Sequence, residues 1–216
     1  TFQATILPNT PLPDSEPTTY SVASKNAYWR HAMDDEFKAL TDQKTWVLVP
    51  KPHGRHPVVC KWVYKIKHNA DGSISRYKAR LVAKGYNQEY GLDYSETFSP
   101  VIWQETIRLV LSLAVRNNWL INQLDVSNAF LHGMLDETIY MMQPPGYVDP
   151  RFPQHVCKLQ KSLYGLKQAP RAWFEKFSTV ITSLGFVPSN HDSALFVRCT
   201  SAGRILLSLY VDDMIK

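Results

Sequence analysis

Two neighbouring segments alternate between apolar and polar side chains and are joined by a turn signal. Residues 58–67 (VVCKWVYKIK) and 74–83 (ISRYKARLVA) are separated by HNADGS, which contains an Asp-Gly pair. Alternation over this length is typical of β-strands, and Asp-Gly favours a tight hairpin turn. A β-hairpin with one apolar face is therefore predicted for residues 58–83.

The positive charge of the chain is concentrated in this region. The net charge is +5, and residues 61–90 alone carry seven basic and two acidic side chains. The basic residues that share a strand face are Lys61, Lys65 and Lys67, and Arg76, Lys78 and Arg80. If these faces meet in register, like charges oppose each other, which is destabilising unless an anion binds there. The pattern predicts a contact with a nucleotide or nucleic acid, although a solvated lysine-rich surface would show the same charge count.

The composition suits a folded protein with a substantial core. Of 216 residues, 44% are hydrophobic and 20% are charged, which argues against intrinsic disorder and allows one large domain or two small subdomains. No apolar run reaches 18 residues, so no membrane span is predicted. The three cysteines are isolated, which favours a reducing compartment over a disulfide framework. Residues 1–20 hold four prolines and no signal-peptide pattern; they are interpreted as a flexible linker, and the Thr1 start suggests a piece of a longer chain.

Helical and extended patterns are mixed along the rest of the chain. Amphipathic helices are predicted over about 25–42, 104–118 and 170–184. The second has its apolar stripe at Ile107, Val110, Leu111, Ala114 and Val115. Short strands are predicted near 46–50, 120–124, 194–199 and 204–210, and a loop over 143–157. Together these elements predict an α+β fold.

Carboxylates follow two of the predicted apolar strands. Asp125 comes directly after 120–124, and Asp212 and Asp213 follow ILLSLYV. Adjacent acids repel unless a cation is present, and Mg²⁺ binds to one or two carboxylates while keeping positions open for phosphates. Two such ions about 3.5–4 Å apart activate a hydroxyl and stabilise a leaving oxygen. A metal-dependent phosphoryl-transfer site is predicted, and an ordinary surface turn is the alternative.

Several blocks of sequence resemble one family. Tyr210-Val211-Asp212-Asp213 resembles the YxDD box of reverse transcriptases. KWVYKIK, YKARLVAKGYNQ, FSP, LDVSNAFLHG, PPGY and LYGLKQAPRAWF occur in the order and at the spacing found in the polymerase of copia-type LTR retrotransposons (Pseudoviridae). The resemblance extends from about residue 25 to the end of the chain. It identifies the chain as an N-terminal fingers and palm fragment of such a pol polyprotein.

The resemblance implies a right-hand polymerase fold of the α+β class. The fingers would comprise about 21–100 and 133–168, and the palm about 101–132 and 169–216, with an antiparallel palm sheet packed on helices. The palm would be incomplete, and the chain would end before the thumb and the RNase H domain. Processive synthesis by this chain alone is therefore not expected.

The resemblance also implies the chemistry of the site. Asp125, Asp212 and Asp213 match the catalytic aspartates. With the backbone carbonyl of Val126 they would bind two Mg²⁺ ions, or Mn²⁺. The primer 3′-hydroxyl would attack the α-phosphate of a deoxynucleotide, and pyrophosphate would leave.

Further residues match positions that contact substrates in the family. For dNTP binding these are Lys65, Lys67, Lys78, Arg80, the aromatic gate Phe130 and Gly165. For template or primer binding they are Lys167, Gln168, Arg171 and Tyr210. Without the resemblance, Phe130 would be interpreted as a core residue, Gly165 as a turn glycine and the others as surface residues.

The implied partners are a primed RNA or DNA template, dNTPs, and the thumb, RNase H and integrase segments of the polyprotein, with no membrane. The family works in cytoplasmic virus-like particles or in the nucleus, and is not secreted. One alternative is a degenerate or reused fragment that binds nucleic acid without catalysis. Another, a metal-dependent nuclease, shares the carboxylates but does not explain LYGLKQAP or Phe130.

Overall fold

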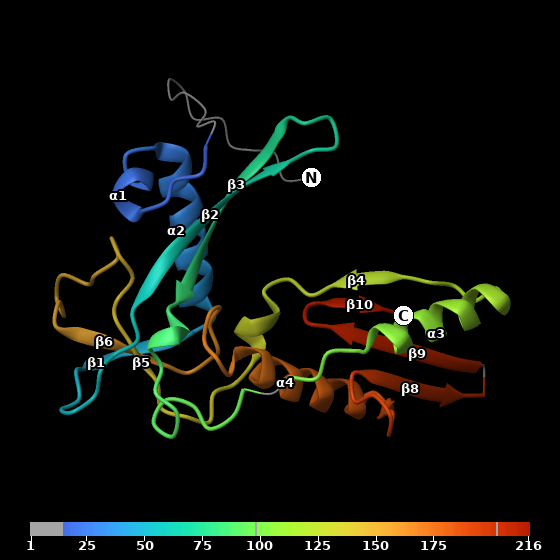
Figure 1. Cartoon of the computed structure of the whole chain (residues 1–216). Coiled ribbons are helices and arrows are strands. Elements are labelled where there is room, and N and C mark those ends of the chain that lie inside the picture. The colour runs from blue at the N-terminus through green and yellow to red at the C-terminus, as the bar shows by residue number, and fades with distance from the viewer. Residues whose placement is uncertain (1–14, 98, 202) are drawn as a thin grey trace. The chain divides into compact units, whose positions relative to one another are not determined.

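The computed structural model describes residues 15–97, 99–201 and 203–216, which form two compact units. The first unit consists of residues up to 94 together with 135–167, and the second of 95–134 together with 168–216. In each unit, helices accompany antiparallel sheets (Figure 1), as the α+β class requires.

The predicted basic hairpin forms in the first unit. Strand β2 (Cys60–His68) pairs with β3 (Ile74–Ala83), and its side chains alternate between buried and exposed as predicted. The register places Lys65 opposite Lys78 and Lys67 opposite Arg76. The expected opposition of like charges is confirmed for these two pairs, whereas the partners of Arg80 and Lys61 are valines.

Helix α2 (Ala27–Asp42) covers the apolar face of this hairpin. The Trp29 ring lies 5.3 Å from the Tyr64 ring and 5.0 Å from the Tyr77 ring. The helix begins two residues later than predicted because the Asn26 side chain accepts hydrogen bonds from the first backbone N–H groups. Of the predicted linker, residues 1–14 lie outside the described residues, and a short helix α1 (Tyr20–Ala23) begins at its end.

A second sheet of the first unit has the strand order β1-β6-β5. Its strands are β1 (Trp46–Pro50), β6 (His155–Leu159) and β5 (Tyr140–Met141). The prediction of a loop over 143–157 is wrong at its end, where Val156 and Cys157 are buried in β6. Pairing with β1, about 110 residues earlier, makes this segment a strand, and local composition does not reveal such a partner. A single 3-10 turn, η1 (Gly85–Asn87), follows β3.

The second unit contains a five-stranded antiparallel sheet with the order β4-β10-β9-β8-β7. These strands are β4 (Gln123–Asp125), β10 (Asp213–Ile215), β9 (Gly203–Tyr210), β8 (Leu195–Thr200) and β7 (Val187–Pro188). Helix α4 (Ala169–Ser183) packs Trp173 and Phe177 into the core cluster that includes Phe196, Leu207 and Leu209 of the sheet. The sheet and α4 therefore share one hydrophobic core.

Helix α4 ends where the sequence predicted. The Gly185 N–H donates to the Thr182 carbonyl (2.9 Å) and the Phe186 N–H to the Ile181 carbonyl (3.3 Å). This is the Schellman arrangement, and Gly185 has the left-handed φ of +84° that it requires.

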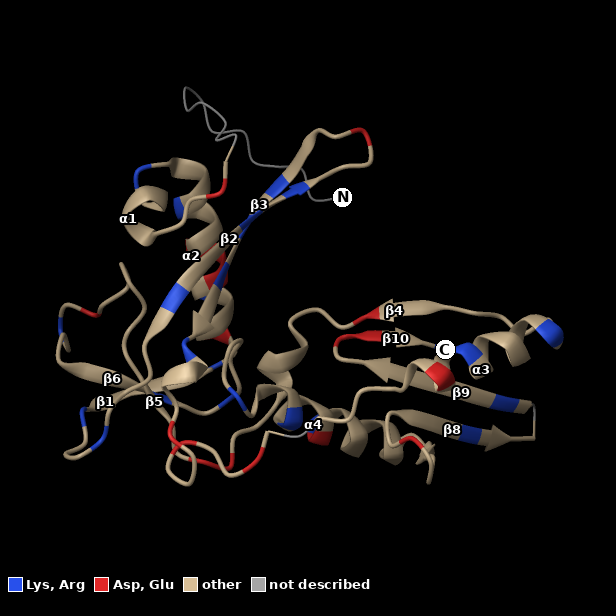
Figure 2. Ribbon diagram, viewed as in Figure 1, with Lys and Arg blue, Asp and Glu red and all other residues tan. Residues whose placement is uncertain are grey.

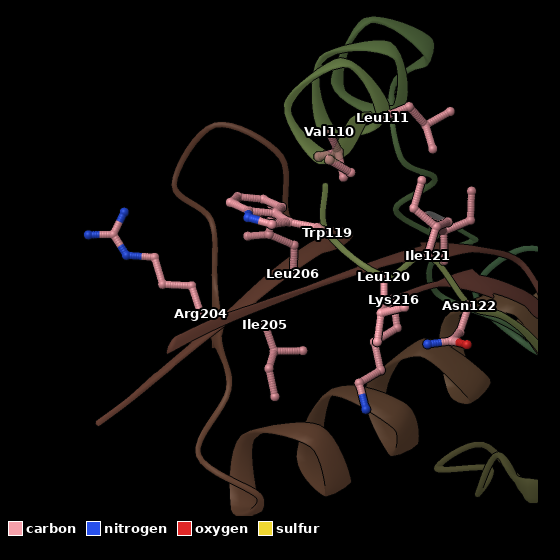
Figure 3. A pocket seen from close by; sticks show the side chains of 12 residues that line it. Val110, Leu111, Trp119, Leu120, Ile121, Asn122, Arg204, Ile205, Leu206 and Lys216 are labelled. Carbon is pink, nitrogen blue, oxygen red and sulfur yellow. The ribbon is translucent and has the colours of Figure 1, made fainter. Parts of the chain in front are cut away.

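Helix α3 (Gln104–Arg116) is much less buried than its apolar stripe predicts. Only Ala114 is buried among the residues of this helix, and Val115 is 71% exposed. Other stripe residues line a cavity of about 340 Å³ between α3, residues 119–122 and the strands β9 and β10 (Figure 3). The stripe thus faces open space rather than a packed core. No helix in the described ranges is long and apolar enough to cross a membrane.

Candidate nucleotidyl-transfer site

A two-residue turn, Val211-Asp212, joins β9 to β10 in the second unit. Val211 has a φ of +59°, which is a strained conformation for a β-branched residue. The indole Nε1–H of Trp173 donates a 2.7 Å hydrogen bond to the Val211 carbonyl. A buried side chain of α4 therefore anchors the turn at its strained residue.

The ladder between β4 and β10 brings the three predicted acids together. Asp125, the last residue of β4, lies opposite Asp213, the first residue of β10. The Val126 N–H donates to the Asp212 carbonyl at 3.0 Å, which ties the chain after β4 to the turn. In Figure 2 the acidic ends of β4 and β10 lie side by side.

Asp125 and Asp213 are exposed and Asp212 is partly exposed, and none of the three has an ion-pair partner in the described part of the chain. The three residues of β4, a strand at the edge of the sheet, are all exposed. The strand predicted near 120–124 begins three residues later than expected, and Asp125 is its last residue. Among the described residues, no Lys, Arg or His forms an ion pair with Asp125, Asp212 or Asp213. The Gln123 amide Nε2 donates a 3.5 Å hydrogen bond to Asp213 Oδ1.

The donor set fits a divalent cation in chemistry and in backbone placement. Facing residues of an antiparallel pair have Cβ atoms about 4.5–5.5 Å apart, within reach of one ion. Carboxylate oxygens are the ligands that Mg²⁺ and Mn²⁺ prefer. The side chains do not converge, however: no three His, Cys, Asp or Glu groups in the described ranges are gathered closely enough to hold a metal.

Phe130 lies in η2 (Ala129–His132), the 3-10 turn that follows the acidic strand. It is partly buried and packs against the same core cluster as Trp173 and Phe177. This is the environment expected of a core phenylalanine at a strand-to-helix junction.

The predicted nucleic-acid contacts of the second unit differ in accessibility. Tyr210 is 55% exposed beside the acidic turn, whereas Gln168 is only 2% exposed. The Arg171 guanidinium pairs with Glu96 (3.0 Å) and with Glu175 (2.7 Å). Of these three side chains, Tyr210 offers the most free surface to a ligand.

The predicted triphosphate cations lie on the hairpin of the first unit, where blue marks run along β2 and β3 in Figure 2. The Lys65 ammonium pairs with the Glu16 carboxylate at 3.1 Å. The Arg80 guanidinium lies 5.0 Å above the Tyr164 ring. Desolvation lowers the pKa of Lys78, and the neighbouring charges of Arg80 and Arg76 lower it further.

Gly165 and Lys167 have structural partners within the first unit. Gly165 has a φ of +86°, and a Cβ there would clash with the Ala83 carbonyl oxygen. The Lys167 ammonium donates to the Tyr94 hydroxyl at 3.0 Å and lies 4.5 Å above the ring of the same tyrosine. The backbone at Gly165 therefore lies directly against the end of β3, and Lys167 is bonded to Tyr94.

The model of the family described as reverse transcriptase (RNA-dependent DNA polymerase) matches residues 43–216, most of the chain. The chain belongs to the reverse transcriptase family. Among the family motifs, Tyr210 to Asp213 forms the turn that carries two of the three acids.

Several relatives of this reverse transcriptase domain are transposon polyproteins. The chain is 51% identical over 203 residues to the retrovirus-related Pol polyprotein from transposon RE1 of Arabidopsis thaliana. It is 52% identical over 203 residues to that from transposon RE2 of the same plant, and 45% over 204 residues to that from transposon TNT 1-94 of Nicotiana tabacum. These matches cover 94% of the chain but only 14–15% of each polyprotein, and they confirm the resemblance to copia-type retrotransposons.

The sequence did not predict the contacts of Glu16 and Glu36 with the hairpin. It predicted that Trp173 is buried, but not its hydrogen bond to the Val211 carbonyl. A signal for Glu36 existed, because it lies three residues after Met33 and four before Leu40 on the buried side of α2. It is only 9% exposed, and burial raises the pKa of its carboxyl. No sequence signal marks the contacts of Glu16 or Trp173, which join residues 38 or more positions apart.

Proposed function

We propose that this chain is the catalytic segment of an RNA-directed DNA polymerase within a retrotransposon Pol polyprotein. Its reaction is nucleotidyl transfer from a dNTP to a primer 3′-hydroxyl on an RNA or DNA template. The observation that carries the proposal is the position of Asp125 opposite Asp213 and beside Asp212, with no ion-pair partner for the three among the residues that the structure describes. Three uncompensated carboxylates at one sheet edge are what a divalent-ion reaction requires.

Asp125, Asp212 and Asp213, with the carbonyl of Val126, would hold two Mg²⁺ ions, or Mn²⁺. When bound, such ions lower the pKa of an attacking hydroxyl and neutralise charge at the transferred phosphate. The protein contributes placement: the β4–β10 ladder and the Trp173–Val211 hydrogen bond hold the backbone of the acids.

The basic hairpin supplies the second part of the proposal. Lys65, Lys67, Lys78 and Arg80 would bind the triphosphate, because an anion relieves the repulsion between Lys65 and Lys78 and between Lys67 and Arg76. In the same proposal Phe130 excludes a 2′-hydroxyl and Gly165 lies near the incoming nucleotide. Lys167, Gln168, Arg171 and Tyr210 would contact template or primer.

The two units would correspond to fingers and palm, the first being the fingers. The thumb, RNase H and integrase segments of the polyprotein would be the partners, and cytoplasmic particles or the nucleus the place of action. The family and the polyprotein relatives support these proposals.

A second candidate function is nucleic-acid binding without catalysis by a reused fragment. One observation favours it: in the described residues, no three carboxylate, His or Cys side chains lie close enough together to hold a metal ion. Binding would then depend on the basic hairpin and on salt, and would be indifferent to the acids.

Primer extension on a polyriboadenylate template with an oligothymidylate primer and Mg²⁺ tests the first proposal. We expect extension by the chain, loss of it in Asp212→Asn, and no change in Asp136→Asn, which removes an exposed acid of the first unit. Extension that survives Asp212→Asn would contradict the proposed metal site. No extension, together with salt-dependent template binding that Asp212→Asn leaves intact, would favour the second function.

A further inference from the structure

Two exposed tyrosines follow the basic hairpin of the first unit. Tyr86 lies in the 3-10 turn η1 and is 73% exposed, and Tyr90, four residues later, is 76% exposed. In the described part of the chain, no other Phe, Tyr or Trp side chain is as exposed as these two. Single exposed apolar residues are common on protein surfaces, so exposure alone does not indicate a function. What distinguishes Tyr86 and Tyr90 is the backbone and the side chains that hold them.

The turn that carries Tyr86 is fastened to a neighbouring segment of the first unit. The Gly85 N–H donates to the Gly165 carbonyl at 3.1 Å, and a Cβ at position 85 would clash with the same oxygen. The side-chain carbonyl of Gln88, which is buried, accepts a 2.8 Å hydrogen bond from the Lys167 N–H. Tyr86 therefore projects from a turn whose backbone is already ordered, so little conformational entropy remains to be lost there when a ligand binds.

Tyr90 belongs to a short series of contacting side chains. Its ring lies edge-on to the Tyr94 ring, with 5.6 Å between the ring centroids. The Lys167 ammonium lies 4.5 Å above the Tyr94 ring and donates to the hydroxyl of that tyrosine at 3.0 Å. The Gly91 N–H donates to the Tyr94 carbonyl at 2.9 Å, which closes the turn between the two rings. The contact with Tyr94 thus orients the Tyr90 ring while most of its surface stays exposed.

Basic side chains accompany the two tyrosines. Lys84 directly precedes η1, and Lys167 lies at the end of the series that begins with Tyr90. The Arg55 guanidinium reaches the same segment, where it donates to the Leu92 carbonyl at 3.4 Å. One acidic residue, Glu89, stands between the tyrosines in the sequence. Exposed aromatic rings beside cations are typical of surfaces that bind single-stranded nucleic acid, because the cations neutralise phosphates while the rings stack on bases.

We propose that Tyr86 and Tyr90 form a stacking platform for unpaired bases of the RNA template. The inference deepens the proposed function and rests on it, because a polymerase must hold the part of the template that is not yet copied. Each ring stacks on one base, and Lys84, Lys167 and Arg55 contact the phosphates of the strand.

The alternative occupant of this surface is another protein segment, since tyrosines are also enriched at protein interfaces. The cations that accompany Tyr86 and Tyr90 favour an anionic strand over such a segment. A protein contact predicts that the two tyrosines make no difference to RNA binding, which can be measured directly.

The experiment is fluorescence anisotropy of a labelled oligouridylate, titrated with the full chain at several salt concentrations. We expect about tenfold weaker binding in Tyr86→Ala and in Tyr90→Ala, which corresponds to about 1.4 kcal/mol and lies within the range for one stacked base. The dependence of affinity on salt should stay that of the wild type, because no phosphate contact is removed. Tyr86→Phe and Tyr90→Phe, which keep the ring, should bind like the wild type.

Two variants of the same unit serve as controls. Phe152→Ala removes another exposed aromatic ring that has a cation, Arg151, 5.7 Å from its centroid, and it should leave RNA binding unchanged. Lys84→Ala should weaken binding and reduce the slope of log affinity against log salt by about 0.7, the value for one phosphate contact on a single strand. The contrast between the slopes separates stacking from charge.

An abasic strand of the same length identifies the bases as the groups that the rings contact. On this strand Tyr86→Ala and Tyr90→Ala should bind like the wild type. Equal losses on the abasic strand and on oligouridylate would overturn the platform. A loss of affinity that is matched by a lower Tm would also overturn it, since substitution of an exposed ring that serves only to bind RNA leaves the fold intact.

The remaining outcomes separate this inference from the proposed function. Wild-type RNA affinity in Tyr86→Ala and Tyr90→Ala overturns the platform, whatever primer extension shows. No RNA binding by the wild-type chain also overturns it. Binding that depends on the tyrosines in a chain that does not extend a primer supports the platform and contradicts the proposed polymerase reaction.

Discussion

Asp213 lies directly opposite Asp125 in the ladder between β10 and β4. Like charges that face each other across an antiparallel pair destabilise it, and no protein cation offsets them in the described residues. The edge of the sheet thus retains a repulsion that a bound divalent ion would convert into attraction. This relationship leads to the first prediction.

Asp125→Asn should stabilise the chain in the absence of divalent ions and remove its response to them. Removal of the charge that faces Asp213 should raise the free energy of unfolding by about 0.2–1 kcal/mol. Addition of Mg²⁺ should raise the Tm of the wild type more than that of the variant. Thermal unfolding with EDTA and with excess Mg²⁺ measures both effects, and an identical Mg²⁺ response in the two proteins would contradict the metal assignment.

Trp173→Phe should loosen the acidic turn. The change keeps an aromatic ring beside Phe177 but leaves the Val211 carbonyl without its indole donor. We expect a loss of about 1–3 kcal/mol in the free energy of unfolding, and slower primer extension. Denaturation and extension assays on Trp173→Phe and on the control Trp119→Phe, a more exposed indole of the same unit, test this. Equal behaviour of the two variants would refute the anchoring role.

Gly165→Ala should be more damaging than Gly91→Ala. Both glycines have left-handed φ values, +86° and +77°, so both substitutions carry conformational strain of about 1 kcal/mol. Only at Gly165 would the new Cβ also clash with a backbone oxygen, that of Ala83, whereas nothing lies within 4 Å of a Cβ at Gly91. Urea denaturation should therefore show the larger loss of stability for Gly165→Ala. A loss no larger than that of Gly91→Ala would mean that the Ala83 contact relaxes at no cost.

The stability of the chain should depend on pH in opposite senses at the two hairpin glutamates. Burial raises the pKa of Glu36 above its unfolded value, so its contribution is present at low pH and lost as pH rises through the folded pKa. Glu36→Gln should therefore gain stability relative to the wild type from about pH 4 upward.

The Glu16 comparison has the reverse sign. The Ile66 N–H and the Lys65 ammonium lower the pKa of Glu16, so its contribution is present above the unfolded pKa and lost as pH falls through the folded one. Glu16→Gln should be less stable than the wild type near neutral pH, and the difference in stability should disappear as the pH falls. Urea denaturation from pH 3 to 8 on both variants provides the measurement. If the stability of Glu36→Gln and that of Glu16→Gln changed with pH in the same direction, the opposite pKa shifts of the two glutamates would be contradicted.

Elements specified by short-range pattern were predictable. The alternation in 58–67 and 74–83 and the Asp-Gly turn predicted β2, β3 and the residues that share each strand face, because the pleat repeats every two residues. The register itself, which sets Lys65 opposite Lys78, came from the structure. The end of α4 was also predictable, since Gly185 is needed at its left-handed position. By contrast, the apolar stripe of α3 did not predict burial, because periodicity shows which residues share a face and not what covers that face.

By itself the sequence determined the family, the elements that carry the candidate site, and the presence of two basic strand faces. Only the tertiary structure decided that Asp125 is paired with Asp213 on an exposed edge strand and that Glu36 lies under β3. Each of these contacts joins segments 45 or more residues apart in the chain. The physical reason is that propensity and periodicity act over a few residues, whereas strand pairing and burial depend on partners that only the folded chain brings together.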